Sequence, residues 1–155
     1  MQKNPRTSIA KGLVLAVLAA VLVSCSAPKY PYKDGHYGAE AAEFDFYGWK
    51  EYVTVYISAG QILTVEYNAF NAAGFIRSWD MDFMRDMNFS KQTHPNAYTR
   101  YYEEKFLAHQ GTAGIDLLSG ATHSYHAFIR LTEASLENAR SGDATTRIVT
   151  VGGYE

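Results

Sequence analysis

The sequence predicts an α+β domain, in which helices pack on a small antiparallel sheet. Two patterns carry this prediction: polar and apolar residues alternate through residues 51–67, and apolar residues recur at helical spacing in three later stretches. The chain has 155 residues, of which 47% are hydrophobic, so it is long enough to form one domain with a packed core.

The firmest structural expectation is a β-hairpin made by residues 51–58 and 61–67, with a turn at Ala59 and Gly60. An earlier strand is expected over residues 34–47, which begin with a turn and continue with an alternation up to Phe44 and Phe46. In the first strand, Val53, Val55 and Ile57 are expected on one face and Tyr52, Thr54 and Tyr56 on the other, with both faces at least partly covered. In the second strand, Leu63, Val65 and Tyr67 are expected to alternate with Ile62, Thr64 and Glu66.

Three helices are expected after the hairpin. One begins with a capped start at residues 78–82, a second runs from Pro95 to about His109 and is ended by Gly111, and a third covers residues 125–139 and is ended by Gly142. Residues 145–151 form either a short strand or a tail. The apolar stripes of the three helices are predicted to contain Phe83, Met84 and Met87; Tyr98, Tyr102 and Phe106; and Tyr125, Phe128, Thr132, Ser135, Leu136 and Ala139.

The first segment has the layout of a secretory signal. Basic residues at positions 3, 6 and 11 precede an apolar run over residues 12–23, which is too short for a transmembrane helix of about 20 residues. The run ends in Leu22, Val23, Ser24 and Cys25, which resembles the lipobox of bacterial lipoproteins. This resemblance implies that Cys25 is acylated and becomes the first residue of the mature chain.

We therefore expect a lipoprotein signal peptide at residues 1–24, a tether at 25–33, a folded domain at 34–142, and a tail or short strand at 143–155. The formal net charge of −2 becomes −5 without the three basic residues of the signal, because Lys+Arg falls from 14 to 11 against 16 Asp+Glu. Such an acidic domain is not expected to bind nucleic acid. The single cysteine excludes an internal disulfide.

Residues 116–124 are the best candidate for a binding stretch. They read Asp-Leu-Leu-Ser-Gly-Ala-Thr-His-Ser and lead into the last predicted helix. Small residues and hydroxyls at a helix start favour an anion such as phosphate, because N–H groups point outward there and the helix dipole is positive. The same residue types are also typical of a simple N-cap, and residue chemistry alone favours this second interpretation.

Other chemistry finds little support in the sequence. It contains no Gly-x-Ser-x-Gly elbow, no glycine-rich phosphate loop with Lys and Ser/Thr, and no His-Glu-x-x-His pair, so hydrolase and nucleotidase functions lack their usual residues. His123 and His126, together with Asp116, offer possible ligands for a divalent metal. We expect no metal site, because no further carboxylate lies at a helical spacing nearby.

The run from Asp116 to Thr122 resembles the flavinylation motif of FMN-binding domains, whose pattern is Asp, two variable residues, Ser or Thr, Gly, Ala and Thr. Such domains occur in the C subunit of the sodium-pumping NADH:quinone reductase, in the G subunit of the Rnf complex, and in lipid-anchored extracellular electron-transfer proteins. In the last group the motif commonly continues with His and Ser, as it does here. The similarity covers roughly residues 34–142 and implies an FMN-binding-domain-like fold.

In this family a Mg²⁺-dependent flavin transferase takes FMN from FAD and joins its phosphate to the last Thr of the motif, here Thr122. The resemblance thus implies a lipid-anchored electron carrier, rather than an enzyme, on the extracytoplasmic side of a bacterial cell membrane or outer membrane. Its implied partners are the flavin transferase and electron donor or acceptor proteins, or a quinone reductase. The implied cofactor-binding residues are Asp116, Ser119, Gly120, Ala121, Thr122, His123 and Ser124.

Two alternatives stay open. In the first, the same fold binds FMN reversibly and serves as a flavin store or shuttle. In the second, the chain is a surface lipoprotein that binds a host or envelope ligand through its aromatic residues and carries no flavin.

Overall fold

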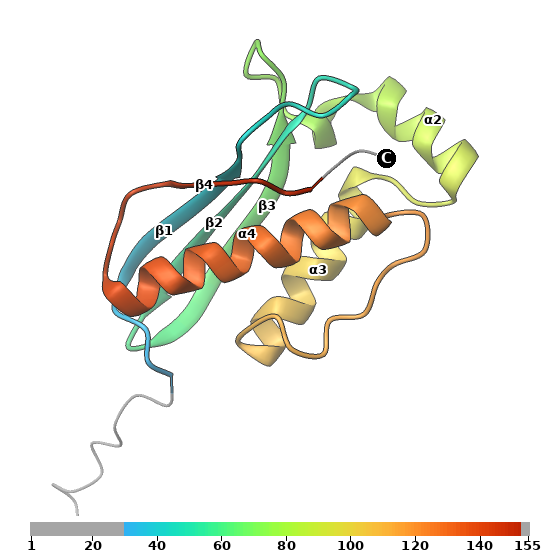
Figure 1. Cartoon of the computed structure of the whole chain (residues 1–155). Helices are drawn as coiled ribbons and strands as arrows, with labels where there is room; N and C mark the ends of the chain where they lie inside the picture. The colour runs from blue at the N-terminus through green and yellow to red at the C-terminus, as the bar shows by residue number, and fades with distance from the viewer. Residues whose placement is uncertain (1–29, 153–155) are drawn as a thin grey trace, which may run out of the picture.

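A computed structural model describes residues 30–152, so the expected signal peptide, Cys25 and most of the expected tether lie outside the described residues. A four-stranded sheet has the order β3-β2-β1-β4 and is covered on one face by two helices, α3 and α4 (Figure 1). The strands are β1 (Gly35–Ala41), β2 (Lys50–Ser58), β3 (Gln61–Phe70) and β4 (Arg147–Val149). The helices are η1 (Arg77–Trp79), α2 (Met81–Lys91), α3 (Pro95–His109) and α4 (Thr122–Ser141).

This architecture confirms the predicted α+β class. Strands β1, β2 and β3 are antiparallel neighbours, as expected. Strand β4 adds a mixed element, because it pairs in parallel with β1. Of the two possibilities for residues 145–151, the short strand is therefore the one that forms.

The β2–β3 hairpin forms with the predicted two-residue turn, in which Ala59 and Gly60 have φ values of 51° and 70°. A β-bulge then shifts the register, so that Ile57 pairs with Ile62 and Tyr56 with Thr64. The extra residue is Leu63, whose side chain is 50% exposed, whereas Ile62 is buried. The prediction that Leu63 shares a face with Val65 and Tyr67 is therefore wrong, because a bulge inserts one residue into the alternation.

The hairpin turn is fixed by Asp34, whose carboxylate accepts hydrogen bonds from the N–H groups of Ala59 (2.9 Å) and Gly60 (3.0 Å). The hydrogen bonds from Gly60 and Ala59 lower the pKa of Asp34 from its usual 3.8. Because the folded-state pKa is depressed, the stabilisation is present above the unfolded value and is lost as the pH falls through the folded value.

We expect Asp34→Ala to lower the melting temperature at pH 7, and the difference from wild type to shrink as the pH falls below 3.8. Thermal unfolding followed by circular dichroism over a pH series measures this difference. Asp116→Ala is the matched control, because Asp116 is exposed and makes no hydrogen bond or ion pair within residues 30–152. A difference that stays constant down to pH 2 would contradict the assignment.

The strand predicted over residues 34–47 ends early, at Ala41. Residues 42–49 form a loop, which is closed by the Asp45 carboxylate accepting hydrogen bonds from the N–H groups of Tyr47 and Trp49, both at 2.8 Å. The prediction of strand through Phe44 and Phe46 is therefore wrong. The strand ends early because the Asp45 side chain binds the backbone N–H groups of Tyr47 and Trp49, which a longer strand would have used in its ladder.

The helices follow the sequence closely. Helix α2 is capped by Asp80, which accepts a hydrogen bond from the Phe83 N–H (2.9 Å), and α3 begins at Pro95 as predicted. Helix α4 starts at Thr122, three residues earlier than expected, and ends at Gly142, whose φ of 77° fits a glycine C-cap. None of the helices in residues 30–152 combines the length and apolar character that a bilayer span requires.

The expected stop of α3 at Gly111 is replaced by a left-handed Gln110, with φ 55°. The amide of Gln110 explains this position, because it binds the outer edge of β3: its Oε1 accepts from the Ile62 N–H (2.8 Å) and its Nε2 donates to the Ile62 carbonyl (2.9 Å). Glu103, on α3 itself, accepts a hydrogen bond from the Tyr67 N–H at 2.7 Å. Helix α3 thus covers polar backbone groups along this edge.

The core lies between the sheet and the helices, and aromatic rings fill much of it. The ring of Phe128 on α4 lies 5.0 Å from that of Tyr67, 5.5 Å from that of Tyr102 and 5.9 Å from that of Phe106, measured between centroids. The aromatic stripe predicted on the second helix is therefore a core stripe, with Tyr98 also buried.

Candidate functional site

The stretch 116–124 lies in the connection from α3 to α4 and in the first turn of α4. Asp116, Ser119 and Thr122 are exposed, and Ala121 and Ser124 are buried. Thr122 is the first residue of the helix, so its hydroxyl lies at the helix N-terminus. The structure therefore places the motif at the surface, with Ala121 and Ser124 turned into the core.

The predicted Ser/Thr cap is not formed at this helix start. The N-cap is Ala121, which makes no side-chain hydrogen bond, and the first intrahelical bond runs from the Tyr125 N–H to the Ala121 carbonyl (2.9 Å). The N–H groups of residues 122–124 come before this bond and have no partner within the helix, and the positive end of the helix dipole there favours an anion.

The backbone conformation and the packing at position 120 both require glycine. Its φ is 81°, and a Cβ atom at this position would lie 2.5 Å from the carbonyl oxygen of Lys91 and 3.1 Å from a methyl group of Thr93. The motif loop thus packs directly against the chain between α2 and α3. Only glycine satisfies both the left-handed conformation and this close approach.

Two tyrosines fasten the loop to the core. The Tyr102 hydroxyl donates to the Ala121 carbonyl (3.4 Å) and accepts from the Leu118 N–H (3.3 Å), and the Tyr125 hydroxyl donates to the Ile115 carbonyl (3.1 Å). Burial raises the pKa of Tyr102 to about 12, so its hydroxyl stays protonated at neutral pH.

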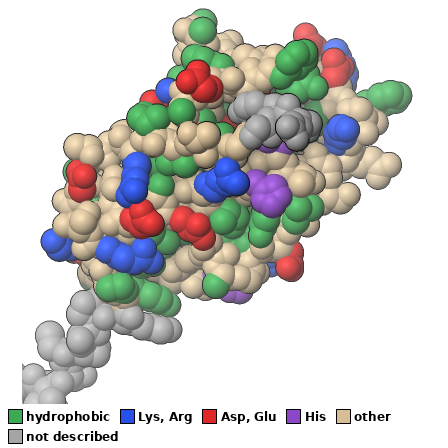
Figure 2. All heavy atoms as spheres, in the orientation of Figure 1, with side chains coloured by type: hydrophobic (Ala, Val, Ile, Leu, Met, Phe, Trp, Pro, Cys, Tyr) green, Lys and Arg blue, Asp and Glu red, His purple; other side chains and the backbone are tan. Residues whose placement is uncertain are grey.

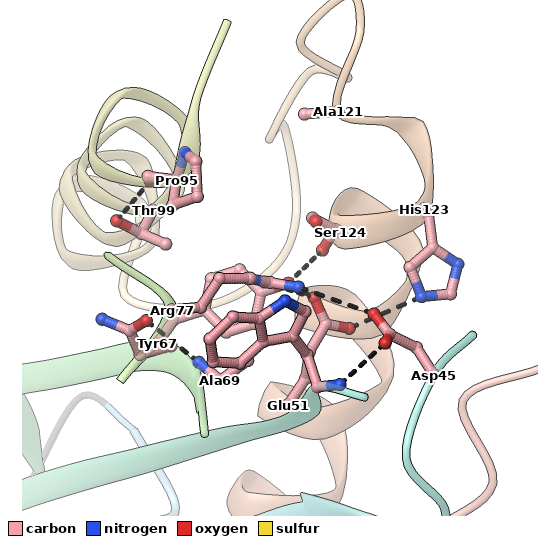
Figure 3. A network of polar contacts seen from close by, with 12 residues as sticks. Asp45, Glu51, Tyr67, Ala69, Arg77, Pro95, Thr99, Ala121, His123 and Ser124 are labelled. Atoms are coloured by element: carbon pink, nitrogen blue, oxygen red, sulfur yellow. Dashed lines mark hydrogen bonds and ion pairs between the residues drawn. The ribbon is translucent and has the colours of Figure 1, made fainter. Parts of the chain in front are cut away.

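A buried polar cluster lies beneath the first turn of α4, and we call Glu51, Arg77 and Tyr67 the Glu51 cluster. Arg77 Nη2 lies 2.8 Å from Glu51 Oε1. The Tyr67 hydroxyl lies 2.8 Å from the same Glu51 oxygen and 2.7 Å from the Ser124 carbonyl oxygen. All three side chains are buried, and Figure 3 shows them meeting at one point.

The electrostatics of this cluster keep Arg77 charged and Tyr67 neutral. Burial by itself lowers the pKa of Arg77, but Tyr98 and Glu51 face the guanidinium and raise its pKa above the usual value. Burial, and then the charge of Glu51, raise the pKa of Tyr67 well above 10.0. A phenol has one proton, so the Tyr67 hydroxyl shares it between two acceptors, the Glu51 carboxylate and the Ser124 carbonyl.

Besides Tyr98, two further side chains border the cluster. Asp45 Oδ2, in the loop after β1, lies 4.0 Å from Arg77 Nη1, and His123 Nε2 lies 3.7 Å from Glu51 Oε2 (Figure 3). His123 is half-buried, which places the residue after Thr122 against the cluster. Segments distant in the chain therefore converge under the motif.

Sequence reasoning missed the Glu51 cluster. A signal was present for Glu51, because period 2 places it on the same face of β2 as Val53, Val55 and Ile57. Arg77 lies in a short 3₁₀-helix, and its partner lies 26 positions away, so no local pattern indicates it.

His123, His126 and Asp116, the possible metal ligands, do not form a ligand cluster within the described residues. No group of three or more His, Cys, Asp and Glu side chains in residues 30–152 is placed to hold a metal ion. His126 is exposed and its ring lies 5.2 Å from that of Tyr125, while Asp116 stands apart in the loop.

Taken together, the fold and this site define a small α+β domain that displays a helix-start motif at its surface. No protein-family model matches the sequence. The chain is 31% identical over 135 residues to the 15 kDa lipoprotein of Treponema pallidum (strain Nichols), which covers 87% of this chain and 94% of that protein. The chain therefore belongs to the family of this lipoprotein.

A solved structure shares the fold. The crystal structure of a protein from Clostridium perfringens is similar with a TM-score of 0.73 and 31% sequence identity, covering 77% of this chain and 98% of that one. Nearly the whole of that protein thus corresponds to the folded domain described here.

Proposed function

We propose that this chain is a lipid-anchored flavoprotein, which carries FMN covalently on Thr122 and passes electrons on the extracytoplasmic side of a bacterial membrane. The observation that carries the proposal is the position of Thr122. It is exposed, it is the first residue of α4, and it ends a run that resembles a flavinylation motif. Membership of a lipoprotein family supports the anchored part of the proposal.

The residues at this position fit a phosphodiester. The hydroxyl of Thr122 supplies the attachment oxygen, and the N-terminus of α4 stabilises the remaining negative charge. In the attachment step, a bond forms between Thr122 Oγ and the phosphorus of the FMN half of FAD. The pyrophosphate bond breaks, and AMP leaves with the hydroxyl proton.

Bound FMN would supply one- or two-electron transfer, and the protein would orient and tune it. The chain itself would act as a carrier, with a flavin transferase as the enzyme that modifies it. Electron donor or acceptor proteins, or a quinone reductase, would be its redox partners.

The proposed anchor and the proposed flavin lie at opposite ends of α4. The Lys33 N–H donates to the Ala139 carbonyl (3.0 Å), so the chain from the tether enters the domain near the C-terminal end of this helix (Figure 1). Thr122 starts the same 20-residue helix, which is about 30 Å long at 1.5 Å per residue. A flavin on Thr122 would thus be held away from the tether.

The decisive experiment co-expresses the chain with a flavin transferase and measures the intact mass. We expect wild type to gain the mass of one esterified FMN, and Thr122→Ala to gain none, because the attachment oxygen is removed. Thr54→Ala is the matched control, since it removes an exposed threonine hydroxyl from β2, outside the motif, and it is expected to keep the bound flavin. An FMN adduct on Thr122→Ala, or no adduct on wild type, would disprove the proposal.

Two other functions are separated by simple measurements. If FMN binds reversibly, yellow protein loses its flavin in a denaturing gel, and no fluorescence migrates with the chain.

The second candidate, a surface lipoprotein without flavin, is favoured by the exposed apolar side chains near α2 (Figure 2). These are Phe46, Tyr47, Trp79, Met81 and Phe89. Protein that stays colourless after transferase treatment would support that function.

The lipid anchor is a separate proposal and concerns Cys25, outside the described residues. Mature wild-type protein is expected to begin at an acylated Cys25. Cys25→Ala is expected to leave the signal uncleaved and the chain without lipid, because the acylated thiol is absent. Mass spectrometry of the mature N-terminus measures both, and an unacylated wild-type chain beginning elsewhere would contradict this part.

A further inference from the structure

Glu51 is an unusual residue for its place in the core. It is 1% exposed and lies on the same face of β2 as Val53, Val55 and Ile57. Its ion pair with Arg77 is fully buried, and such pairs generally add little stability compared with apolar residues of similar volume. The core alone therefore does not explain the pair.

The contacts of the Glu51 cluster lead to the two residues that follow Thr122. The Tyr67 hydroxyl contacts the Ser124 carbonyl at 2.7 Å, and Glu51 Oε2 lies 3.7 Å from His123 Nε2. Figure 3 shows these groups below the first turn of α4. Thr122 is exposed, whereas Ser124, two residues further along the helix, is buried, so the hydroxyl of Thr122 points away from the cluster.

Helix α4 lacks the usual device that fixes a helix start. Its N-cap, Ala121, has no side chain that can bond to the first turn, although Ser, Thr, Asp and Asn caps normally do this. The first turn is held from the sheet side, through the hydrogen bond between Tyr67 and the Ser124 carbonyl. Glu51, which is paired with Arg77, accepts a hydrogen bond from the Tyr67 hydroxyl in turn.

We propose that Glu51, Arg77 and Tyr67 are positioning residues, which fix the first turn of α4 so that the Thr122 hydroxyl is presented in one orientation to the flavin transferase. This inference rests on the proposed function. The motif loop keeps its own support from Tyr102 and Tyr125, so the cluster acts on the orientation of Thr122 more than on recognition of the loop. Its loss therefore lowers kcat of the transfer and leaves KM unchanged.

The first test is Tyr67→Phe, which removes one hydroxyl and keeps the ring in the core. In the unmodified chain, we expect amide hydrogen exchange over residues 125–128, whose N–H groups bond the carbonyls of the first turn, to become about tenfold faster, as for the loss of one hydrogen bond. With purified transferase and FAD, kcat is expected to fall about tenfold at unchanged KM. Tyr52→Phe is the matched control, because the Tyr52 hydroxyl bonds Glu66 on the far face of the sheet, and it is expected to change neither quantity.

The second test replaces the whole cluster by apolar residues, in the triple variant Glu51→Leu, Tyr67→Phe, Arg77→Met. Because both charges leave together, no unpaired ion remains, and the melting temperature is expected to match or exceed that of wild type. The proposal requires kcat of the transfer to fall about tenfold even so, which a purely structural role would not produce. This variant also keeps the test valid if Tyr67→Phe folds poorly.

Three results would overturn the inference: unchanged exchange in both cluster variants, an unchanged kcat in both, or equal slowing in Tyr52→Phe. Wild-type chain that takes up no FMN would instead disprove the proposed function. In that case the exchange rates of the unmodified variants still decide whether the cluster fixes the first turn of α4.

Discussion

Arg77→Met is expected to lower the free energy of unfolding by about 3 to 5 kcal/mol, because it leaves the Glu51 carboxylate charged and buried without its ionic partner. Glu51 is enclosed by the apolar face of β2, so water cannot replace the guanidinium without opening the core. Of the groups that remain beside Glu51, the Tyr67 hydroxyl is already shared with the Ser124 carbonyl, and His123 Nε2 lies 3.7 Å away.

Urea unfolding monitored by circular dichroism measures this loss. Arg85→Met is the matched control, because Arg85 pairs with Asp82 at 3.0 Å but both side chains are largely exposed. Exposed pairs contribute about 0 to 1 kcal/mol, so the control is expected to remain close to wild type. Equal losses in the two variants would show that burial of the Glu51–Arg77 pair has no special energetic role.

Gly120→Ala is expected to cost about 2 to 5 kcal/mol of folding free energy. About 1 to 2 kcal/mol arises from placing alanine in the left-handed region, and the rest from overpacking against the Lys91 carbonyl, which a Cβ would approach to 2.5 Å. A backbone oxygen cannot rotate away as the end of a flexible side chain can. The loop and the segment between α2 and α3 must therefore separate.

Gly74→Ala separates the two contributions. Gly74 has a similar φ of 79° but no atom within 4 Å of the position of a Cβ, so only the conformational cost of about 1 to 2 kcal/mol is expected. The two variants can be compared by the same urea unfolding experiment. If Gly120→Ala costs no more than Gly74→Ala, the packing of the motif loop against Lys91 does not contribute to stability.

Local patterns in the sequence were sufficient for most of the fold. The hairpin turn at Ala59 and Gly60, the Asp80 cap and the end of α4 at Gly142 were all predictable, because the residues that form them are neighbours in the chain. The predictions that failed did so for physical reasons that the spacing of apolar residues does not reveal. Leu63 is turned outward by a bulge, and Asp45 takes backbone N–H groups that would otherwise extend β1.

For the candidate site, too, some features follow from the local sequence and others do not. The position of residues 116–124 between a loop and a helix start follows from local composition, and the structure confirms this placement. The absence of a side-chain cap does not follow, because the helix begins at Thr122 and its cap is Ala121. The contact of Arg77 with Glu51 depends on how η1 packs against the sheet, so it is visible only in three dimensions.

The side chains of Glu103 on α3 and of its C-cap Gln110, which bond the edge of β3, matter where many chains are anchored close together on a membrane. An open strand edge is a template on which a second chain can pair, and anchoring concentrates chains in two dimensions. Here Gln110 and Glu103 occupy the N–H groups of Ile62 and Tyr67 on one edge, and the opposite edge strand, β4, has only 3 residues. Neighbouring copies of this lipoprotein are thereby kept from polymerising through their sheets.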